Sequence, residues 1–434
     1  MKLTRLVLKD FRCFGQLDLD FASPITLLVG VNGAGKSSIL EALSASVGLW
    51  GRAIVDSHAD PGSVGASIRG EVVRRQRADD AAPLQAAIPE EAAQLSLWLE
   101  LPSGSGRVDF RVMPSEVSTP GTADAALWSM ISGTVTSIRD GEGVTLPVHA
   151  AYSVRRATKE PGRTFKVTSR ASGYIGSMGA TVDVGALREW LGEMTAIELQ
   201  EGREVPERGA VERAVLDCLE GASSFIYQFR SRELLLTLDD LTLPLSMYSD
   251  GIRSLVAMVA DIAWRCAVLN PHFGADAARE TPGVVLIDEI DLHLHPSWQW
   301  RVLDDLHRAF PKVQFIVTTH SPQVIASVDA SALRVLGADR QVHKVEHSKG
   351  WDVGHVLEDI MGVPSRRADM QARLQALDVL IDNGELDAAK LAVAALRDDL
   401  GSDYPDVTRA EWSLRMAEVE RDTDPSEVEA DAEP

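Results

Sequence analysis

Hydrophobic and polar positions alternate near the start of the chain and then gather into a short apolar run. Leu3, Leu6 and Leu8 lie in an alternating pattern, and the apolar run at residues 25–29 leads directly into glycines. Alternation with a period of two indicates a half-buried strand, and a short apolar run that ends in glycine is typical of a buried one. The pattern therefore predicts strand, strand, loop and helix over residues 1–50.

The pattern changes twice in the middle of the chain. Residues 51–90 are rich in Gly, Ala, Asp and Arg without a sustained period, so we expect a loop or weak order there. Residues 94–150 carry short alternating runs broken by Gly and Pro, which predict β-structure. From about 185 to 230 the apolar spacing becomes helical. We expect residues 51–240 to form an insertion, β-rich and then helical, part of which completes the domain begun by the first segment.

Signals for an α/β domain return in residues 241–364. Apolar residues at helical spacing occupy positions 255–266, and continuous apolar runs occupy positions 284–287 and 314–317. Short continuous runs are typical of strands that are buried on both faces of a parallel sheet. This segment is therefore the expected second half of the domain that residues 1–50 begin.

The C-terminal part of the chain is predicted to be helical and then acidic. Two helical patterns flank Asn383-Gly384, so we expect a helical hairpin over residues 365–420. Residues 421–434 are acidic with Pro and Ala, which is typical of a disordered tail. Sustained heptads are absent from the sequence, and this excludes a long coiled-coil arm.

The net charge of −21 over 434 residues changes the expectation for partners. An acidic surface repels phosphate backbones, so tight nonspecific binding of DNA by the bare chain is not expected. One basic stretch could override this locally, although a solvated loop is the favoured interpretation. Its members are Arg155, Arg156, Lys159, Arg163, Lys166 and Arg170.

Cysteine usage and hydropathy indicate a cytoplasmic protein with no membrane contact. Cys13, Cys218 and Cys266 are isolated and odd in number, which suits a reducing compartment. The N-terminus alternates polar and apolar residues, unlike a signal peptide. No run of about 18 apolar residues occurs, so no transmembrane helix is expected.

The strongest chemical signal is Gly30-Val-Asn-Gly-Ala-Gly-Lys-Ser37, a G-x-x-x-x-G-K-S phosphate loop between a predicted strand and a predicted helix. Its glycines let successive backbone N–H groups face a β-phosphate, and the start of the helix adds its positive end. Lys36 would reach the β- and γ-phosphates and assist catalysis, and the Ser37 hydroxyl would ligate Mg²⁺. The expected ATP-binding residues here are Asn32, Gly33, Ala34, Gly35, Lys36, Ser37 and Ser38.

Two further signals follow buried strands. The apolar run at 284–287 ends in Asp288 and Glu289. Nucleotides bind at the carboxyl ends of strands in open α/β folds, so Asp288 would hold Mg²⁺, directly or through water, and Glu289 would polarise the attacking water. His320, in Thr-Thr-His-Ser-Pro, would hydrogen-bond the γ-phosphate, although a structural role is commoner for a lone histidine.

A second anion site precedes another predicted helix. Ser249, Asp250 and Gly251 lie where the N-terminus of a helix would bind an anion. Because the chain already carries a phosphate loop, this second site should serve another ATP, bound to another copy. The sequence therefore predicts a homodimer with composite sites, and a higher assembly of dimers stays open.

The order of phosphate loop, Ser-Asp-Gly signature, Asp-Glu strand and histidine resembles the ABC ATPase superfamily. The resemblance implies an α/β fold: an ABC-type P-loop ATPase head with a β-rich and helical insertion and a C-terminal helical hairpin. The opening Leu-Lys-Asp-Phe-Arg-Cys-Phe is similar to the start of the RecF, SMC and OLD branch, which implies that Arg12 lies against the nucleotide. Within that branch, Ser-Asp-Gly-Ile-Arg, Asp-Ile-Ala-Trp-Arg and the stretch from Gly350 to Gly362 look most like PtuA, the ATPase of Septu and of some retron anti-phage systems, which is paired with an HNH nuclease.

Three features depart from the family or compete with it. Ile252-Arg253 replaces the Gly-Gly-Gln of transporters, and Tyr152-Ser-Val-Arg155 stands roughly where a Q-loop glutamine would be. Asp291, His293 and His295 could be read as a zinc cluster. Their similarity to the D-loop of stand-alone ATPases in the branch explains them better.

Two main functions follow from these interpretations. The first is a slow, regulatory ATPase, with ATP and Mg²⁺ as cofactors, that acts as sensor and scaffold of an anti-phage system. It would control a separate HNH nuclease, through which nucleic acid would be reached, and would not itself be a nuclease. The hairpin after residue 365 would dock that partner or pack back on the head. The alternative is a RecF-like repair ATPase that binds DNA directly, against which the acidic charge argues.

Overall fold

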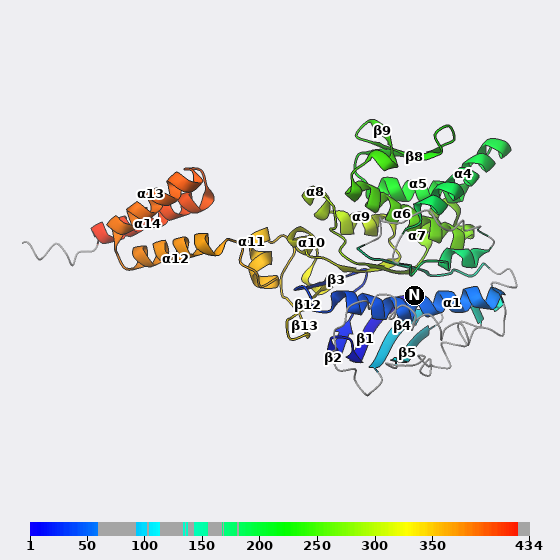
Figure 1. The fold of residues 1–434 in the computed structure, drawn as a ribbon, viewed down its shortest axis with the longest axis horizontal. Coiled ribbons are helices and arrows are strands. Elements are labelled where there is room, and N and C mark those ends of the chain that lie inside the picture. The colour runs from blue at the N-terminus through cyan, green and yellow to red at the C-terminus, as the bar shows by residue number, and fades with distance from the viewer. Residues whose placement is uncertain are drawn as a thin grey trace, which may run out of the picture. The chain divides into compact units, whose positions relative to one another are not determined.

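The computed structural model describes residues 1–59, 93–101, 104–112, 133–134, 136–137, 143–154, 167, 169–179 and 182–423. The chain forms two compact units, Met1–Val356 and Leu357–Pro434 (Figure 1). The second unit begins before residue 365, where the helical patterns of the sequence had placed its start. None of the helices in the described segments is long and apolar enough to cross a lipid bilayer.

A six-stranded sheet forms the centre of the first unit, in the order β13-β12-β3-β11-β10-β6. All neighbouring pairs are parallel except β12 and β13. Every residue of β10 and β11 is buried, as their continuous apolar runs predicted. The strands are β3 (Ile25–Gly30), β6 (Val148–Tyr152), β10 (Gly283–Ile287), β11 (Val313–Thr318), β12 (Leu333–Leu336) and β13 (Val342–His343).

The register of these parallel strands brings their carboxyl ends to one edge. Ile287 of β10 lies beside Val317 of β11 and beside Tyr152 of β6. Val317 in turn lies beside Leu27 of β3. The segments that follow β3, β10 and β11 therefore emerge together, and these are the segments that carry the predicted nucleotide motifs.

A four-stranded antiparallel sheet, ordered β2-β1-β4-β5, packs beside this centre. The strands are β1 (Lys2–Phe11), β2 (Phe14–Asp20), β4 (Ala93–Leu101) and β5 (Gly104–Val112). The buried side chain of Gln314 joins the two sheets: its Oε1 accepts from Leu3 N at 2.7 Å, and its Nε2 donates to Leu3 O at 2.9 Å. The strands predicted for the insertion thus pair directly with the N-terminal strand of the head.

Helices cover both faces of the central sheet. Figure 1 shows α1 (Lys36–Ala59) along one side, and α5 (Pro206–Cys218) and α6 (Asp250–Leu269) on the other. Because α1 runs to Ala59, the expectation of loop or weak order from residue 51 is wrong for its first residues. Residues 60–90 of that expectation lie outside the described residues. Buried Trp50 and Ile54, one turn apart, continue the packed face of α1.

The remaining helices of the first unit are mostly short. They are η1 (Arg170–Tyr174), α4 (Val184–Glu201), η2 (Leu245–Met247), η3 (Pro271–Asp276), α7 (Ala277–Glu280), α8 (Pro296–Gln299), α9 (Val302–Ala309), α10 (Pro322–Ser327), η4 (Ala330–Ala332) and α11 (Val353–His355). A further helical turn, η5 (Val356–Ile360), spans the boundary between the units.

A three-stranded antiparallel sheet follows α5, made of β7 (Ala222–Gln228), β8 (Glu233–Leu238) and β9 (Leu241–Pro244). The helical pattern expected up to residue 230 is wrong over β7. Leu234, Leu236 and Leu238 of β8 are buried while the residues between them are partly exposed, so one face of this sheet packs inward. The sheet ends only a few residues before Ser249.

His149 of β6 is buried between α1 and η1. Its ring stacks on Tyr174 with 4.5 Å between the ring centroids, and a Cβ at Gly51 of α1 would lie only 2.4 Å from its Nε2. Neither ring nitrogen has a hydrogen-bond partner among the described residues. Burial lowers the pKa of His149 to about 3, so the imidazole is neutral in the folded chain.

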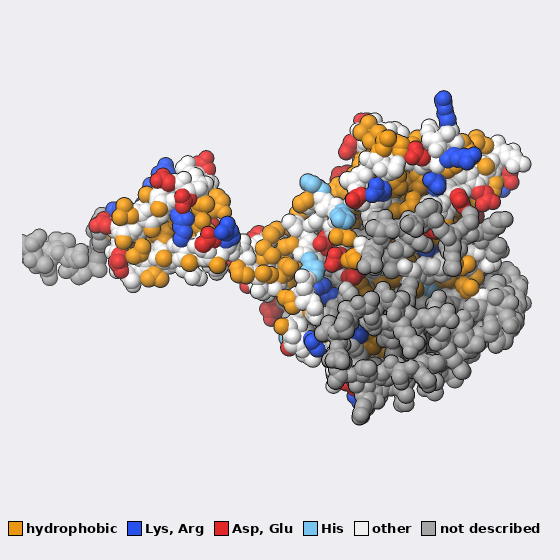
Figure 2. Space-filling model, viewed as in Figure 1, with side chains coloured by type: hydrophobic (Ala, Val, Ile, Leu, Met, Phe, Trp, Pro, Cys, Tyr) orange, Lys and Arg blue, Asp and Glu red, His pale blue; other side chains and the backbone are white. Residues whose placement is uncertain are grey.

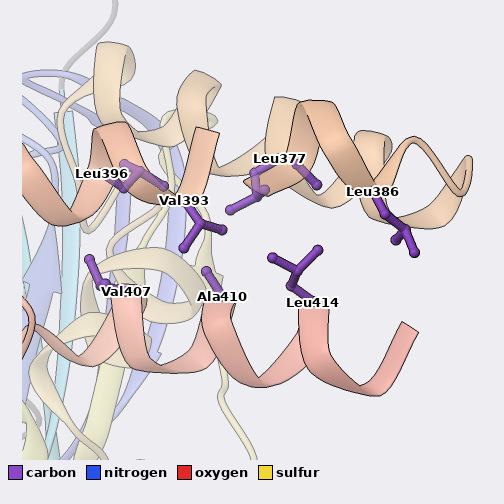
Figure 3. Close-up of a cluster of buried hydrophobic side chains, with 8 residues drawn as sticks. Leu377, Leu386, Val393, Leu396, Val407, Ala410 and Leu414 are labelled. Atoms are coloured by element: carbon purple, nitrogen blue, oxygen red, sulfur yellow. The ribbon is translucent and has the colours of Figure 1, made fainter. Parts of the chain in front are cut away.

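The second unit is a bundle of three helices, α12 (Ala368–Asp382), α13 (Leu386–Leu400) and α14 (Pro405–Thr423). The predicted pair of helices is present, and α14 adds a third that the hairpin interpretation did not include. Figure 3 shows the core that they share: Leu377, Leu386, Ala389, Val393, Leu396, Val407, Ala410 and Leu414. Since α14 continues to Thr423, the expected tail is helical at its start, and residues 424–434 lie outside the described residues.

Candidate nucleotide-binding site

The phosphate loop connects β3 to α1, as the motif predicted. Lys36 is the first residue of α1 and is 7% exposed. Its Nζ donates to Gly30 O at 2.7 Å and to Val31 O at 3.2 Å, so the side chain folds back over the loop. Asn32 and Ser37 are exposed, and Ser38 is half-buried.

Glycine is required at two positions of this loop. Gly33 and Gly35 have φ values of 80° and 104°, in the left-handed region that favours glycine. At Gly35 a Cβ would also lie 2.3 Å from Cζ of Phe14 and 2.7 Å from Sγ of Cys13. The turn between β1 and β2 therefore packs against the phosphate loop too closely for any side chain at position 35.

Lys36 lies in a field of three carboxylates. Burial lowers the pKa of its ammonium group, and the negative charges of Asp288, Glu289 and Asp291 act in the opposite direction. The ammonium group therefore stands close to the two carboxylates that follow β10. Phosphate loop and carboxylates converge as the strand register requires.

Asp288 is held by hydroxyl groups from the start of α1 and from the end of β11. Ser37 Oγ donates to Asp288 Oδ2 at 3.1 Å, and Thr318 Oγ1 donates to Asp288 Oδ1 at 2.5 Å. A serine hydroxyl beside an aspartate carboxylate is a hard oxygen donor set that fits Mg²⁺, which protein sites hold by few side chains and several waters. Thr318 was missed by the sequence reasoning, although it stands directly before the Thr-His pair.

Glu289 takes a backbone conformation that is uncommon for a residue with a side chain. Its φ is 47°, in the left-handed region. Its N–H donates to Thr318 Oγ1 at 2.8 Å, and the next N–H, of Ile290, donates to Thr318 O at 3.0 Å. Such a conformation costs on the order of 1–3 kcal/mol, is held by its surroundings, and occurs preferentially at functional sites.

Asp291 supports the turn that carries His320. Its Oδ1 accepts from Thr319 Oγ1 at 2.5 Å and from His320 N at 3.4 Å. The half-buried His320 therefore lies on a turn fixed to the segment after Glu289.

In the competing zinc interpretation Asp291 would ligate a metal with His293 and His295. Instead, His295 caps α8, with 2.8 Å between its Nδ1 and Ser297 Oγ, and no group of three potential metal ligands occurs among the described residues.

The signature segment begins α6. Ser249 caps the helix, where its Oγ accepts from Ile252 N at 3.4 Å, and Asp250 pairs with Arg253. Ser249 and Asp250 are exposed, whereas Gly251 is buried against the backbone after β10. A Cβ at Gly251 would lie 2.1 Å from His293 O, so the signature and the D-loop-like segment touch within one chain.

Arg12 lies in the turn between β1 and β2, with a φ of 51°. Its guanidinium pairs with Glu41 on the second turn of α1, and both side chains are about half exposed. The structure thus places Arg12 beside the helix that the phosphate loop opens.

Most of the basic stretch lies outside the described residues. This holds for Arg155, which is in the stretch that replaces the Q-loop, and for the other members up to Lys166. Arg170 is described and donates to Leu269 O at 2.6 Å.

A buried polar network behind the site was not predicted. Tyr152 Oη donates to Asp261 Oδ2 at 2.7 Å, and Arg265 Nε donates to the same oxygen at 2.8 Å. The carbonyl of Tyr152, at the end of β6, accepts from Asp288 N at 2.8 Å. The network therefore links the middle of the signature helix to the backbone of the predicted Mg²⁺ ligand. A signal existed in the sequence, because Asp261 and Arg265 are an i, i+4 pair in an otherwise apolar helix.

The first unit has a P-loop α/β fold: the phosphate loop follows β3, and carboxylates lie at the same edge of the mostly parallel sheet. The chain matches the family model described as an AAA domain over residues 5–77. It also matches the model described as an AAA domain, putative AbiEii toxin, Type IV TA system, over residues 160–326.

Three curated relatives show which ATPases the chain resembles. The chain is 36% identical over 156 residues to the Retron Ec83 probable ATPase of Escherichia coli, which covers 36% of this chain and 28% of that protein. It is 45% identical over 92 residues to the Retron Vc95 probable ATPase of Vibrio cholerae serotype O1 biovar El Tor, covering 20% and 17%. It is 33% identical over 130 residues to the Septu protein PtuA of Bacillus thuringiensis, covering 28% and 33%. The chain thus spans a third or less of these relatives' lengths, and the predicted resemblance to retron and Septu ATPases is confirmed.

The buried network should contribute strongly to stability. Asp261→Ala leaves the Arg265 guanidinium buried without its carboxylate, and we expect a loss of about 3–5 kcal/mol in the free energy of unfolding. Glu280→Ala, which removes an exposed ion pair with Lys312, should cost less than about 1 kcal/mol. Urea denaturation of both variants measures the difference. Similar small losses for both would show that the network is not a structural anchor.

Proposed function

We propose that this chain binds ATP with Mg²⁺ and hydrolyses it slowly, at sites that a second copy completes. The observation that carries the proposal is the convergence of Lys36, Ser37, Asp288 and Glu289 at one edge of the central sheet. An ammonium group, a hydroxyl and two carboxylates in this arrangement fit a nucleotide phosphate chain with its metal ion. The similarity to proteins described as probable ATPases gives independent support.

Each side chain then has a distinct task. Lys36 and the N–H groups from Asn32 to Ser38 bind the phosphates, and Ser37 and Asp288 hold Mg²⁺. Glu289 orients and polarises the attacking water, and His320 hydrogen-bonds the γ-phosphate. Bound Mg²⁺ neutralises charge that develops on the phosphates during transfer. Arg12 lies beside the bound nucleotide, within reach of α1, where it now pairs with Glu41.

The signature supports a head-to-tail homodimer. Ser249 and Asp250 are exposed at the start of α6, and Gly251 packs on the segment after β10 instead of on the phosphate loop of its own chain. An exposed helix N-terminus binds anions, so Ser249, Asp250 and Gly251 contact the ATP held by the other copy. Two such contacts close two composite sites, and a higher assembly of dimers is compatible with them.

We further propose that the ATPase regulates an anti-phage defence system in the cytoplasm by controlling a separate HNH nuclease. The similarity to a protein named Septu protein PtuA and to retron ATPases supports this role. The second unit is the proposed docking surface. On α14, Trp412, Met416 and Val419 are all more than half exposed and share one face at spacings of four and three residues.

ATP hydrolysis should depend on Lys36 and Glu289 in different ways. Lys36→Ala removes a phosphate contact, so nucleotide affinity should fall at least about tenfold. Glu289→Gln keeps the shape but loses the carboxylate that polarises water, so ATP should bind and persist while turnover falls about 100-fold or more. Calorimetry and single-turnover assays separate the two effects. Wild-type turnover by Glu289→Gln would remove Glu289 from the catalytic role.

Ser249 should act on the ATP of the other copy. Ser249→Arg blocks the signature, and Lys36→Ala disables the phosphate loop. In a mixed dimer both defects fall on one composite site and leave the other intact, so activity should return to as much as about half of the wild-type value if the two sites act independently. Mixing separately tagged variants and assaying the purified heterodimer measures this. A heterodimer as inactive as its parents would contradict the shared-site arrangement.

The second unit should be required for the partner and not for ATP binding. A chain that ends at Val356 should still bind ATP and form dimers, but should lose capture of the co-expressed nuclease and protection from phage. In the full chain, Trp412→Ala with Met416→Ala should weaken capture because both changes remove apolar contact area. Leu391→Ala, which alters an even more exposed apolar residue on α13, is the control. Undiminished capture by the truncated chain would refute the docking surface.

A further inference from the structure

The tip of the hairpin between β7 and β8 carries an aromatic residue followed by two arginines. Phe229, Arg230 and Arg232 are all exposed there, and the Phe229 side chain is 46% exposed. Figure 2 shows basic side chains standing out from the surface around β8 and β9, beside hydrophobic ones. The tip thus combines an exposed aromatic ring with two exposed basic side chains.

The two arginines of the tip have no acidic partner among the residues that the structure describes. Neither guanidinium makes an ion pair or a hydrogen bond with another described residue. Two other exposed arginines of the same unit do pair: Arg213 with Asp276 at 3.0 Å and Arg279 with Asp217 at 3.3 Å. In a chain with 64 acidic and 43 basic residues, two arginines that lie two positions apart and pair with no other described residue are available for an anion from outside.

The tip is held in a fixed conformation. Arg232 N donates to Gln228 O at 2.8 Å, and Ser231 Oγ donates to Gln228 Oε1 at 2.8 Å. The ring of Phe229 meets the half-buried ring of Tyr227 edge to face, with 5.2 Å between the centroids. The two rings are therefore not stacked face to face, and the ring contact positions Phe229 while the hydrogen bonds hold the backbone of the tip.

The tip is also connected to the signature. Glu233, the first residue of β8, accepts from Ser246 Oγ at 3.4 Å. Arg253 donates to Ser246 O at 3.4 Å and pairs with Asp250 of the signature. These polar contacts connect the tip to the start of α6, which Ser249 caps.

We propose that this tip binds single-stranded nucleic acid and reports its presence to the signature turn. Arg230 and Arg232 contact phosphates, and Phe229 stacks on an unpaired base. A duplex has its bases already stacked, so it offers the arginines their phosphates but offers Phe229 no free base face. The reporting part rests on the proposed ATPase function, whereas the binding part does not.

Fluorescence anisotropy with a labelled oligodeoxythymidylate tests the binding part on the full chain without ATP. Wild-type binding should be measurable at low salt and weaken steeply as salt rises. Arg230→Ala with Arg232→Ala should lower affinity about tenfold or more, and Phe229→Ala should lower it about five- to 100-fold. The control variant, Arg213→Ala with Arg279→Ala, lacks two exposed arginines that form ion pairs. Its affinity for the oligonucleotide should lie within about twofold of the wild-type value.

Several results would overturn the site. The first is that the wild type does not bind the strand at low salt, and the second is that the control pair loses as much affinity as the Arg230 and Arg232 pair. The third is that a duplex binds as tightly as the single strand and that this binding does not change in Phe229→Ala. Loss of dimers in the arginine pair with unchanged strand binding would instead assign the tip to a second copy of the chain.

The reporting part is tested separately by ATP turnover with and without the same oligonucleotide. The strand should change wild-type turnover, and Ser246→Ala should bind the strand normally but lose most of that change. An unaltered response in Ser246→Ala would refute the connection. A chain that binds the strand but hydrolyses no ATP would refute the proposed ATPase function and leave the binding site standing.

Discussion

The parallel register of β6, β10, β11 and β3 is the constraint on which the rest of the head depends. Parallel neighbours end at the same edge, so the phosphate loop, the two carboxylates and the histidine turn emerge side by side. The hydroxyl of Thr318 then joins two of these ends, since it donates to Asp288 and accepts from the N–H of Glu289. A shift of one strand by a single residue would move every side chain of that strand to the opposite face of the sheet and separate these groups.

The signature helix is tied to the same edge from behind. Asp261 and Arg265 of α6 are bound to Tyr152, whose carbonyl accepts from Asp288 N. The signature, which is proposed to contact the ATP of a second copy, is thus connected through buried, hydrogen-bonded groups to Asp288, the predicted Mg²⁺ ligand of its own site. Breaking a buried pair of this kind is costly, so the connection is stiff.

Local motifs were predictable, and contacts between distant segments were not. The phosphate loop and the buried strands at 284–287 and 314–317 were found because glycine spacing and continuous apolar runs are local signals. The clamp of Gln314 on Leu3 joins residues 311 positions apart and leaves no pattern in either segment. The prediction of a helix was wrong over β7, because the change from helical to alternating spacing comes soon after α5 and was placed at about residue 230 instead. The third helix of the C-terminal bundle was missed because its outward face also carries apolar residues, which obscure the helical pattern.

The burial of His149 gives the head a sensitivity to acid. In the unfolded chain an imidazole has its ordinary pKa of 6.5, whereas in the folded chain the pKa is about 3. As the pH falls below 6.5, the unfolded chain gains a proton that the folded chain cannot accept. Each further unit of pH down to about 3 therefore removes up to about 1.4 kcal/mol from the free energy of unfolding. At neutral pH the imidazole carries no such cost, so the packing of Tyr174 and Gly51 around it is tolerated there.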